Sequence, residues 1–250
     1  MLKGKINLSE RTDLSNFLVH LTRDSPESSA KESLISILNA QKIEARNHHC
    51  LFKKSLEKEP LDFQKKFYVT CYTETPLDKI KHLTKKIENR NKKFQPYGLV
   101  FIKSNQKKSE KGSENAPNPV FYAMGNNGFL IRALFSEFDQ YLEDFENGNP
   151  NNFNLIGSLV NIVNENHNFQ WEREWRTVGD YEFLIPELAA VIAPSSEHSD
   201  IRSKVNYYFA DAITFIDIDW NMEQILLHIG AQSWNNWHEY YQLANPILEE

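Results

Sequence analysis

Short runs of β-branched and aromatic residues, spaced between segments of helical periodicity, constrain the fold of this chain more than any other feature. Strand-like runs lie at residues 17–22 (FLVHLT), 67–73 (FYVTCYT) and 97–103 (YGLVFIK). Apolar residues at helical spacing mark residues 30–40 and the acidic amphipathic stretch 129–145. Strands and helices do not alternate regularly, so the pattern predicts an α+β fold.

Weaker patterns predict the remaining elements. Proline at position 76 suits the first turn of a helix, which we expect to run to about residue 91. The segments 97–103 and 119–123 flank a polar stretch, and we expect them to pair as a hairpin. Further strands are predicted at residues 171–178, 189–193 and 213–218, and further helices at residues 155–163 and 222–229.

Length and composition favour one soluble domain. A chain of 250 residues with 40% hydrophobic residues indicates one domain with excursions, or a core plus a small appendage, and we expect a single domain over residues 1–250. We expect a mobile loop at about residues 103–118, which are polar and charged, and an acidic helical insertion at about residues 126–165. No apolar run approaches the ~18 residues of a membrane span, and no secretory signal is recognisable. With only two cysteines, the sequence predicts a cytoplasmic protein without a disulfide framework.

Charge divides the chain into a basic and an acidic half. Residues 1–111 hold 23 Lys and Arg against 13 Asp and Glu, and residues 112–250 hold 5 against 21. The basic half indicates a surface for a polyanion; the alternatives are two halves that neutralise each other, or ordinary solvated faces. In the predicted basic helix, helical spacing places Lys81, Lys85 and Lys92 on one exposed stripe suited to nucleic-acid phosphates.

Several common catalytic motifs are absent. The sequence has no P-loop, GxGxxG, GxSxG, HExxH or paired CxxC, and only 9 glycines, which argues against a glycine-built phosphate cradle. His48, His49 and Cys50 are consecutive, and consecutive side chains of a strand point to opposite faces. We therefore expect no metal site there.

The segment EREWR carries the most informative constellation. If it is a strand, Glu172 and Glu174 share one face, and Arg173 and Trp175 share the other. Like charges placed so close raise the pKa of one another, which suits acid, base or cation-stabilising chemistry. The alternative is a surface strand with both glutamates solvated and Arg176 paired.

Two further groups are candidates for ligand binding. Alternation places His20 and Thr22 on one face of the first strand, where they would bind a sugar hydroxyl or an amide; the alternative is a core histidine bonded to the backbone. Tyr72 and Thr73 end the second strand, and Tyr97 opens the third. A tyrosine there would stack on a planar ligand or simply pack.

These motifs follow one another as LVHLTR, SILNAQKIEA, YVTCYTETPL, PYGLVFIK, NPVFYA, EREWR and AVIAP. The order resembles the AbiGi-type abortive-infection proteins of phage resistance over about residues 17–194, most specifically in CYTETPL, YGLVF and EREWR. The early strand with His-x-Thr and the helix after it also resemble DarT-like ADP-ribosyltransferases. The resemblance implies an ADP-ribosyltransferase-like fold, a split antiparallel β core with surrounding helices.

The same resemblance implies roles for individual residues. In ADP-ribosyltransferases an early strand holds the NAD ribose and a late strand carries a catalytic glutamate. By this resemblance Glu174 is catalytic and Glu172 orients or deprotonates the acceptor, while NAD is a consumed co-substrate and no metal is needed. The residues implied to bind NAD are His20, Thr22, Tyr72, Thr73 and Tyr97, together with either Arg11 or Arg23.

We therefore expect a mono-ADP-ribosyltransferase toxin of a phage-defence or toxin–antitoxin system. Its acceptor would be a nucleic acid, RNA in preference to DNA, and a cognate antitoxin protein would restrain it. Two alternatives stay open. One is a metal-independent ribonuclease that uses His20 and Glu174, and the other is a non-catalytic regulatory partner, or antitoxin, of an abortive-infection system.

Overall fold

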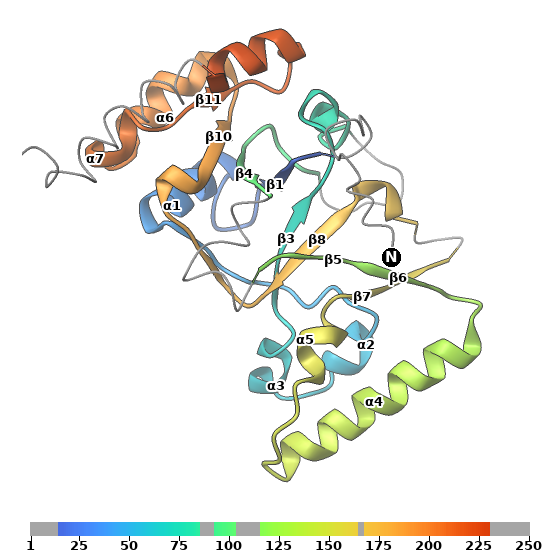
Figure 1. The fold of residues 1–250 in the computed structure, drawn as a ribbon. Helices are drawn as coiled ribbons and strands as arrows, with labels where there is room; N and C mark the ends of the chain where they lie inside the picture. The colour runs from blue at the N-terminus through green and yellow to red at the C-terminus, as the bar shows by residue number, and fades with distance from the viewer. Residues whose placement is uncertain (1–14, 86–92, 104–115, 165–167, 231–250) are drawn as a thin grey trace, which may run out of the picture. The chain divides into compact units, whose positions relative to one another are not determined.

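The computed structural model of the chain describes residues 15–85, 93–103, 116–164 and 168–230. Helices and mainly antiparallel strands are combined in it, so the predicted α+β class is confirmed in this general form (Figure 1). The prediction of a single domain stays a prediction. The chain groups into two compact units, the first from Met1–Gln41, Thr75–Lys103 and Leu184–Glu250, the second from Lys42–Glu74 and Ser104–Phe183.

Four strands of the first unit lie in the order β11-β10-β4-β1. β4 is central and pairs antiparallel with both β1 and β10, while β11 pairs parallel with β10. A Cβ on Gly98 would lie 2.5 Å from the carbonyl oxygen of His20, so only glycine permits this close pairing at the start of β4. The strands span Phe17–Leu21 (β1), Gly98–Ile102 (β4), Leu188–Ile192 (β10) and Phe215–Ile216 (β11).

The helix predicted at residues 30–40 is confirmed as α1 (Ala30–Ala40). It begins at a capping box, in which the Ser29 hydroxyl accepts from the Glu32 N–H and the Glu32 carboxylate accepts from the Ser29 N–H. The helix predicted after Pro76 is instead a 3₁₀ segment, η2 (Leu77–His82), and residues 86–92 of that prediction lie outside the described residues. The other helical segments of this unit are η5 (Ile185–Glu187), η6 (Ser195–Glu197), α6 (His198–Lys204), α7 (Tyr207–Ala210) and residues 222–230.

The core of the first unit joins the strands to η2. Leu77, Ile80 and Leu83 of this segment are buried. They pack into one apolar cluster with residues of β1, β4, β10 and β11. Apolar packing therefore anchors this segment although it is not an α-helix.

The described residues of the second unit form three strand groups. β8 (Glu174–Val178) lies between β3 (Val69–Thr73) and β5 (Asn118–Pro119) and pairs antiparallel with both. The short strands β2 (Lys42–Ile43) and β9 (Tyr181–Glu182) pair antiparallel, whereas β6 (Phe121–Met124) and β7 (Val160–Val163) pair parallel.

The hairpin predicted between residues 97–103 and 119–123 is wrong. β4 pairs with β1 and β10, and β6 pairs with β7. Strand partners are chosen by packing between distant parts of the chain, so neighbouring strand patterns around a polar stretch do not fix them. Residues 104–115 of the predicted mobile loop lie outside the described residues.

Aromatic packing holds the helices of the second unit together. The rings of Phe52 and Phe138 stack with their centroids 4.8 Å apart, and Phe63 and Phe67 pack beside them. This aromatic cluster packs α4 against the short helices (Figure 1). The helix predicted at residues 129–145 is confirmed as α4. The helices span Lys53–Leu56 (α2), Leu61–Lys65 (α3), Gly128–Glu146 (α4) and Phe153–Gly157 (α5).

The apolar helix predicted at residues 155–163 is half wrong. α5 ends at Gly157, and the chain continues as β7. A Cβ on Gly157 would lie 2.9 Å from the Phe153 ring and 3.1 Å from the Phe67 ring, so the chain here fits closely against the aromatic core. The β-branched residues of β7 then suit a strand. The predicted insertion at residues 126–165 is consequently helical only in part.

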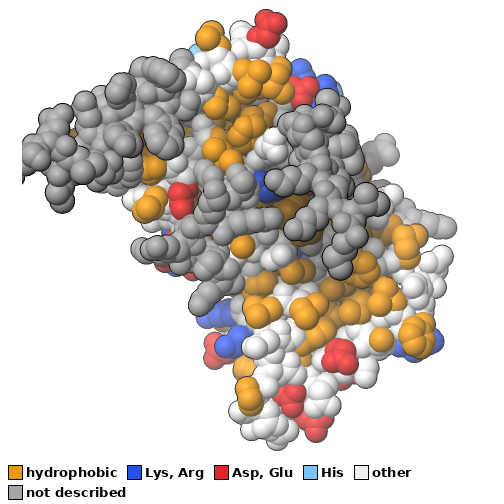
Figure 2. Space-filling model, viewed as in Figure 1, with side chains coloured by type: hydrophobic (Ala, Val, Ile, Leu, Met, Phe, Trp, Pro, Cys, Tyr) orange, Lys and Arg blue, Asp and Glu red, His pale blue; other side chains and the backbone are white. Residues whose placement is uncertain are grey.

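Large apolar side chains are exposed on the second unit. Phe129 at the start of α4 is 80% exposed and Ile156 on α5 is 64% exposed. Figure 2 shows hydrophobic side chains gathered on the surface of this part of the molecule. Among the described residues, no helix has the length and apolar character needed to cross a bilayer.

Candidate active site at the start of β8

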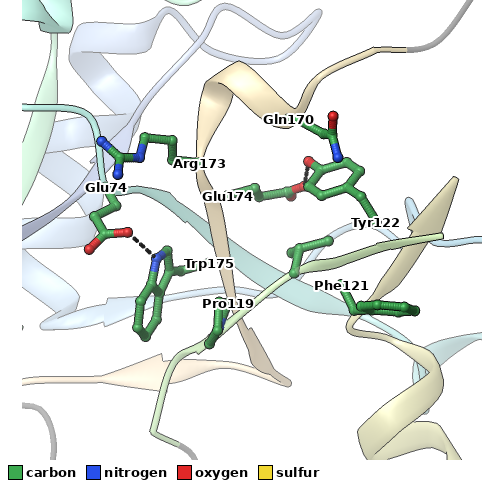
Figure 3. Close-up of a pocket in the computed structure, with 9 residues that line it drawn as sticks. Glu74, Pro119, Phe121, Tyr122, Gln170, Arg173, Glu174 and Trp175 are labelled. Carbon is green, nitrogen blue, oxygen red and sulfur yellow. Dashed lines mark hydrogen bonds between the residues drawn. The ribbon is translucent and has the colours of Figure 1, made fainter. Parts of the chain in front are cut away.

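A pocket of about 430 Å³ lies in the second unit at the first residues of β8 (Figure 3). Its volume is within the range of small-molecule sites. Charged, polar and aromatic side chains line it, and they come from the end of β3, from β5 and β6, and from the turn before β8. The lining residues are Glu74, Pro119, Val120, Phe121, Tyr122, Gln170, Arg173, Glu174 and Trp175.

Three hydrogen bonds hold the Glu174 carboxylate at this pocket. Its Oε1 accepts a hydrogen bond from Arg176 Nε at 2.9 Å, and its Oε2 accepts from Arg176 Nη2 at 2.9 Å. Tyr122 donates its hydroxyl proton to Oε2 at 3.1 Å. A bidentate guanidinium fixes the plane of a carboxylate as well as its position. The Glu174 side chain remains 15% exposed, so it is oriented by the protein yet open to the pocket.

Arg176 is a buried charge whose partner is Glu174. Its side chain is 1% exposed, and Nη1 donates to the Ser158 carbonyl oxygen at 2.7 Å. Burial alone lowers the pKa of an arginine, but the negative charge and hydrogen bonds of Glu174 outweigh it and raise the pKa of Arg176 above its usual range. Arg176 is therefore a permanent cation behind the pocket.

Tyr122 on β6 donates its hydroxyl proton to Glu174, and both side chains lie on the same side of the β8 backbone (Figure 3). Burial, and then the negative charge of Glu174, raise the pKa of Tyr122 well above its usual value. The phenol therefore keeps its proton throughout the neutral range. It acts as a hydrogen-bond donor to the carboxylate and not as a base.

The other side of β8 carries a second carboxylate. Glu74 follows β3 directly, is buried, and accepts a hydrogen bond from Trp175 Nε1 at 3.2 Å. Figure 3 shows Glu74, Arg173 and Trp175 on one side of the β8 backbone, and Glu174 with Tyr122 on the other. The pocket thus offers two carboxylates, one guanidinium and exposed parts of aromatic rings.

The prediction that Glu172 and Glu174 share one face of a strand is wrong. Glu172 ends a 3₁₀ turn, η4 (Gln170–Glu172), and β8 begins only at Glu174. Between them Arg173 adopts a left-handed conformation with φ of 48°, which interrupts the strand alternation. Glu172 is absent from the pocket lining, whereas Glu174 is part of it. The alternative that paired Arg176 with a carboxylate is observed, although the pair is buried.

Thr73 belongs to the support of this turn. Its hydroxyl donates to the carbonyl oxygen of Glu172, and the Glu74 N–H donates to the carbonyl oxygen of Arg173 at 3.0 Å. The end of β3 therefore clamps the turn before β8. Tyr72, one residue earlier, is buried with its ring edge-to-face on Tyr181, and burial raises its pKa.

The other residues predicted to bind NAD belong to the first unit. His20 is half-buried on β1 opposite Leu99. Thr22 is buried, and its hydroxyl donates to the carbonyl oxygen of Ala30 at 2.8 Å. The half-buried Tyr97 donates its hydroxyl proton to Glu197, and burial together with this carboxylate raises the pKa of Tyr97. Of the two candidate arginines, Arg23 lies in the loop after β1 and Arg11 lies outside the described residues.

The predicted nucleic-acid stripe is described only in part. Lys81 and Lys85 are exposed, at the end of η2 and just after it. Lys92 lies outside the described residues. Because the described part of this segment is a 3₁₀ turn, the α-helical spacing that aligned the three lysines does not apply there.

Sequence reasoning missed several residues of the pocket. Tyr122 and Glu74 approach Glu174 and Trp175 from distant parts of the chain, and Gln170 is brought there by the turn η4, so no local motif signals them. Arg173 carried no signal because a left-handed residue is normally marked by glycine or asparagine. Among the described residues, no group of three or more His, Cys, Asp and Glu is placed to hold a metal ion.

No protein-family model, curated protein or solved structure matches this chain significantly.

Proposed function

We propose that the chain is a mono-ADP-ribosyltransferase that consumes NAD and uses Glu174 as its catalytic carboxylate. The observation that carries the proposal is the fixed orientation of this carboxylate at the pocket. Glu174 accepts one hydrogen bond on Oε1 and two on Oε2. A carboxylate has about four acceptor positions, so Oε1 retains one for a ribose hydroxyl.

The chemistry needs a fixed anion of this kind. In the transfer the bond between nicotinamide and ribose C1′ breaks, and its electron pair leaves with neutral nicotinamide. Positive charge develops on the ribose, and a nucleophilic atom of the acceptor then bonds to C1′ and loses its proton. Glu174 accepts a hydrogen bond from the ribose 2′-hydroxyl and stabilises the developing charge, and Arg176 and Tyr122 keep the carboxylate in place without reorganisation.

Glu174 and Glu172 take different parts in this proposal. Glu174 acts on the NAD ribose, and Glu172, on the preceding turn, stays the candidate for orienting the acceptor. His20 and Tyr97 are half-buried residues of the first unit, and their contact with NAD stays a prediction from the sequence. The hydroxyls of Thr22 and Thr73 are bonded to backbone carbonyls. We therefore assign both threonines to shaping the elements that carry the NAD-binding residues. Tyr72, which is buried against Tyr181, supports the end of β3.

We propose a nucleic acid, RNA in preference to DNA, as the acceptor, and a cognate antitoxin as the restraining partner. Exposed Lys81 and Lys85 in the basic part of the chain support a phosphate-binding surface. An enzyme that modifies nucleic acid in its own cytoplasm is toxic, which is why an antitoxin is expected.

The test is incubation of the purified chain with NAD labelled in its adenine, in the presence of RNA, DNA and protein. We expect label in the RNA fraction and free nicotinamide in solution. Shortened RNA without label and without nicotinamide release would favour the ribonuclease instead. Neither label nor cleavage would favour the regulatory partner.

A further inference from the structure

The extended segment that forms β5 and β6 changes its pairing partner along its length. The Val120 N–H donates to the Glu174 carbonyl oxygen at 2.9 Å, on the side of β8. The next N–H, that of Phe121, donates to the Leu159 carbonyl oxygen at 2.9 Å, on the side of β7. Because backbone groups of successive residues in a strand point to alternate sides, the N–H and C=O of Tyr122 point back to the side of β8.

The strand β8 does not extend far enough to meet these groups. It begins at Glu174, and the left-handed backbone of Arg173 turns the preceding chain into η4. Among the described residues, the Tyr122 N–H and C=O and the Met124 N–H, which points to the same side, make no hydrogen bond. The pocket lies at this interruption, since Tyr122 lines it together with Gln170 of η4 (Figure 3).

The opposite edge of this two-stranded sheet is covered. On β7 the Val160 carbonyl oxygen accepts from the Leu51 N–H at 2.9 Å, and the Ile162 N–H donates to the side-chain oxygen of Asn161 at 2.9 Å. Strand edges without a partner are commonly protected by a lysine, a proline or a bulge. Residues 121–124 (FYAM) contain neither residue type, and their register with β7 is regular. The free edge of β6 is therefore open to a further strand.

Apolar side chains lie on both faces of this open edge. Phe121 is 53% exposed and Met124 is 52% exposed, and their odd spacing places them on opposite faces of β6. Such side chains pack well against β-branched or aromatic cross-strand neighbours. The unpaired donors and acceptor recur at the two-residue spacing of an extended peptide, whose own C=O and N–H groups complement them. The edge therefore suits an extended polypeptide with apolar side chains.

We propose that an extended segment of a partner protein pairs with the open edge of β6. The added strand lies where β8 would continue if the chain did not turn at Arg173, so it occupies the pocket beside Glu174. The inference deepens the proposed function and rests on it for its consequence. Under that function the partner is the cognate antitoxin, which restrains the enzyme by filling the pocket with this strand.

The experiment uses capped hexapeptides that alternate threonine with valine, leucine or phenylalanine as probes of the full chain. Each peptide is also made with N-methyl groups on one or the other alternate set of amides, which removes the donors of one edge at a time. Met124→Pro removes an open N–H of β6 and keeps the bonds to β7, and proline is tolerated on an edge strand. Met124→Leu is the matched control. Binding is measured by calorimetry and the thermal midpoint Tm beside it.

We expect the wild type and Met124→Leu to bind at least one unmethylated peptide. Methylation of one alternate set of amides and the Met124→Pro substitution should each weaken that peptide at least about fivefold, the effect of one lost hydrogen bond. Methylation of the other set should leave the affinity unchanged. If Met124→Pro lowers Tm, Met124→Lys decides instead, since a lysine blocks strand addition and needs no backbone change.

Four results would overturn the proposal. They are a wild type that binds none of the peptides, equal affinity for both methylated forms and the parent, and an equal loss in Met124→Leu and Met124→Pro. The fourth is a wild-type dimer that Met124→Pro or Met124→Lys converts to monomers, because a second copy of the chain would then occupy the edge.

Nicotinamide release is measured separately, with and without saturating peptide, so that the two proposals fail independently. Edge-dependent peptide binding without any NAD cleavage supports the strand site and contradicts the transferase. NAD cleavage by a wild type that binds no peptide does the reverse. Cleavage that continues at an unchanged rate in the peptide-saturated protein overturns the claim that the added strand fills the pocket.

Discussion

Glu174 and Arg176 form a bidentate ion pair two residues apart on one face of β8, with both nitrogen–oxygen distances at 2.9 Å. Arg176 is 1% exposed, so the glutamate is the counterion of a buried charge as well as the proposed catalytic anion. A substitution that tests the chemistry of Glu174 therefore also disturbs the fold. The predictions below separate these two roles.

Glu174→Gln should destabilise the protein by about 3 kcal/mol, because removal of one partner leaves the other as an uncompensated buried charge. Urea unfolding measures this free energy. Glu174→Gln combined with Arg176→Met should recover most of the loss, since an apolar side chain then replaces the buried cation. Glu172→Gln is the matched control and should change stability by less than about 0.5 kcal/mol. A Glu174→Gln single variant as stable as the wild type contradicts the counterion role.

Tyr122 should make stability fall at high pH. Burial and the charge of Glu174 raise its pKa, so the folded protein keeps the phenol proton after the unfolded chain loses it, near a pKa of about 10. The contribution of Tyr122 to the free energy of unfolding is therefore complete below about pH 10 and declines as the pH rises above that value. Tyr122→Phe should lessen the decline without removing it, since the pKa of Tyr72 is raised as well.

Urea unfolding at a series of pH values from about 8 to about 11 tests this dependence. The two curves should run parallel at the lower pH values and converge as the pH rises. Curves of wild type and Tyr122→Phe that keep a constant separation over the whole series would show that the Tyr122 pKa is not raised.

Tyr97 should contribute to NAD binding through its ring and to the fold through its hydroxyl. The hydroxyl donates to Glu197, which also pairs with Lys31 at 2.6 Å. Tyr97→Phe keeps the ring, so NAD affinity should be preserved with a loss of about 1 kcal/mol in stability. Tyr97→Ala should weaken NAD about tenfold. Equal NAD affinity of the alanine and phenylalanine variants would remove Tyr97 from the site.

Lys81 and Lys85 should support acceptor binding through phosphate contacts. Charge reversal of both should weaken RNA binding, and the slope of log affinity against log salt should fall by about 2 in magnitude. NAD cleavage with water as acceptor should persist. Binding is measured at two or more salt concentrations beside the thermal midpoint. An unchanged slope with a lowered midpoint would assign these lysines to packing within the protein.

Local patterns predicted the elements that depend on local interactions. The helix Ala30–Ala40 was predictable because its capping residues and apolar spacing lie within one short segment. The strands at Phe17–Leu21, Val69–Thr73 and Leu188–Ile192 were predictable from dense apolar runs. Glu174 was likewise found from the sequence, and it lines the pocket together with Arg173 and Trp175 of the same motif.

The wrong predictions concern the strand partner of residues 119–123 and the backbone conformation of Arg173. The parallel pair β6–β7 joins segments almost forty residues apart along the sequence numbering, and the local pattern of residues 119–123 contains no information on that partner. The alternation argument for Glu172 failed at Arg173, where contacts from the end of β3 hold a left-handed residue. The buried pair of Glu174 with Arg176 was equally invisible to the local pattern, because Arg176 also donates to the carbonyl oxygen of Ser158, eighteen residues away.

Release of nicotinamide from NAD tests the central claim most directly. The wild type is compared with the Glu174→Gln/Arg176→Met double variant, after urea unfolding has established that the double variant is folded. We predict release by the wild type and a rate lower by a factor of about 10² or more in the double variant, as expected for the loss of a preorganised charge. A wild type that releases no nicotinamide with or without RNA, or a folded double variant that matches the wild-type rate, would contradict a catalytic role for Glu174.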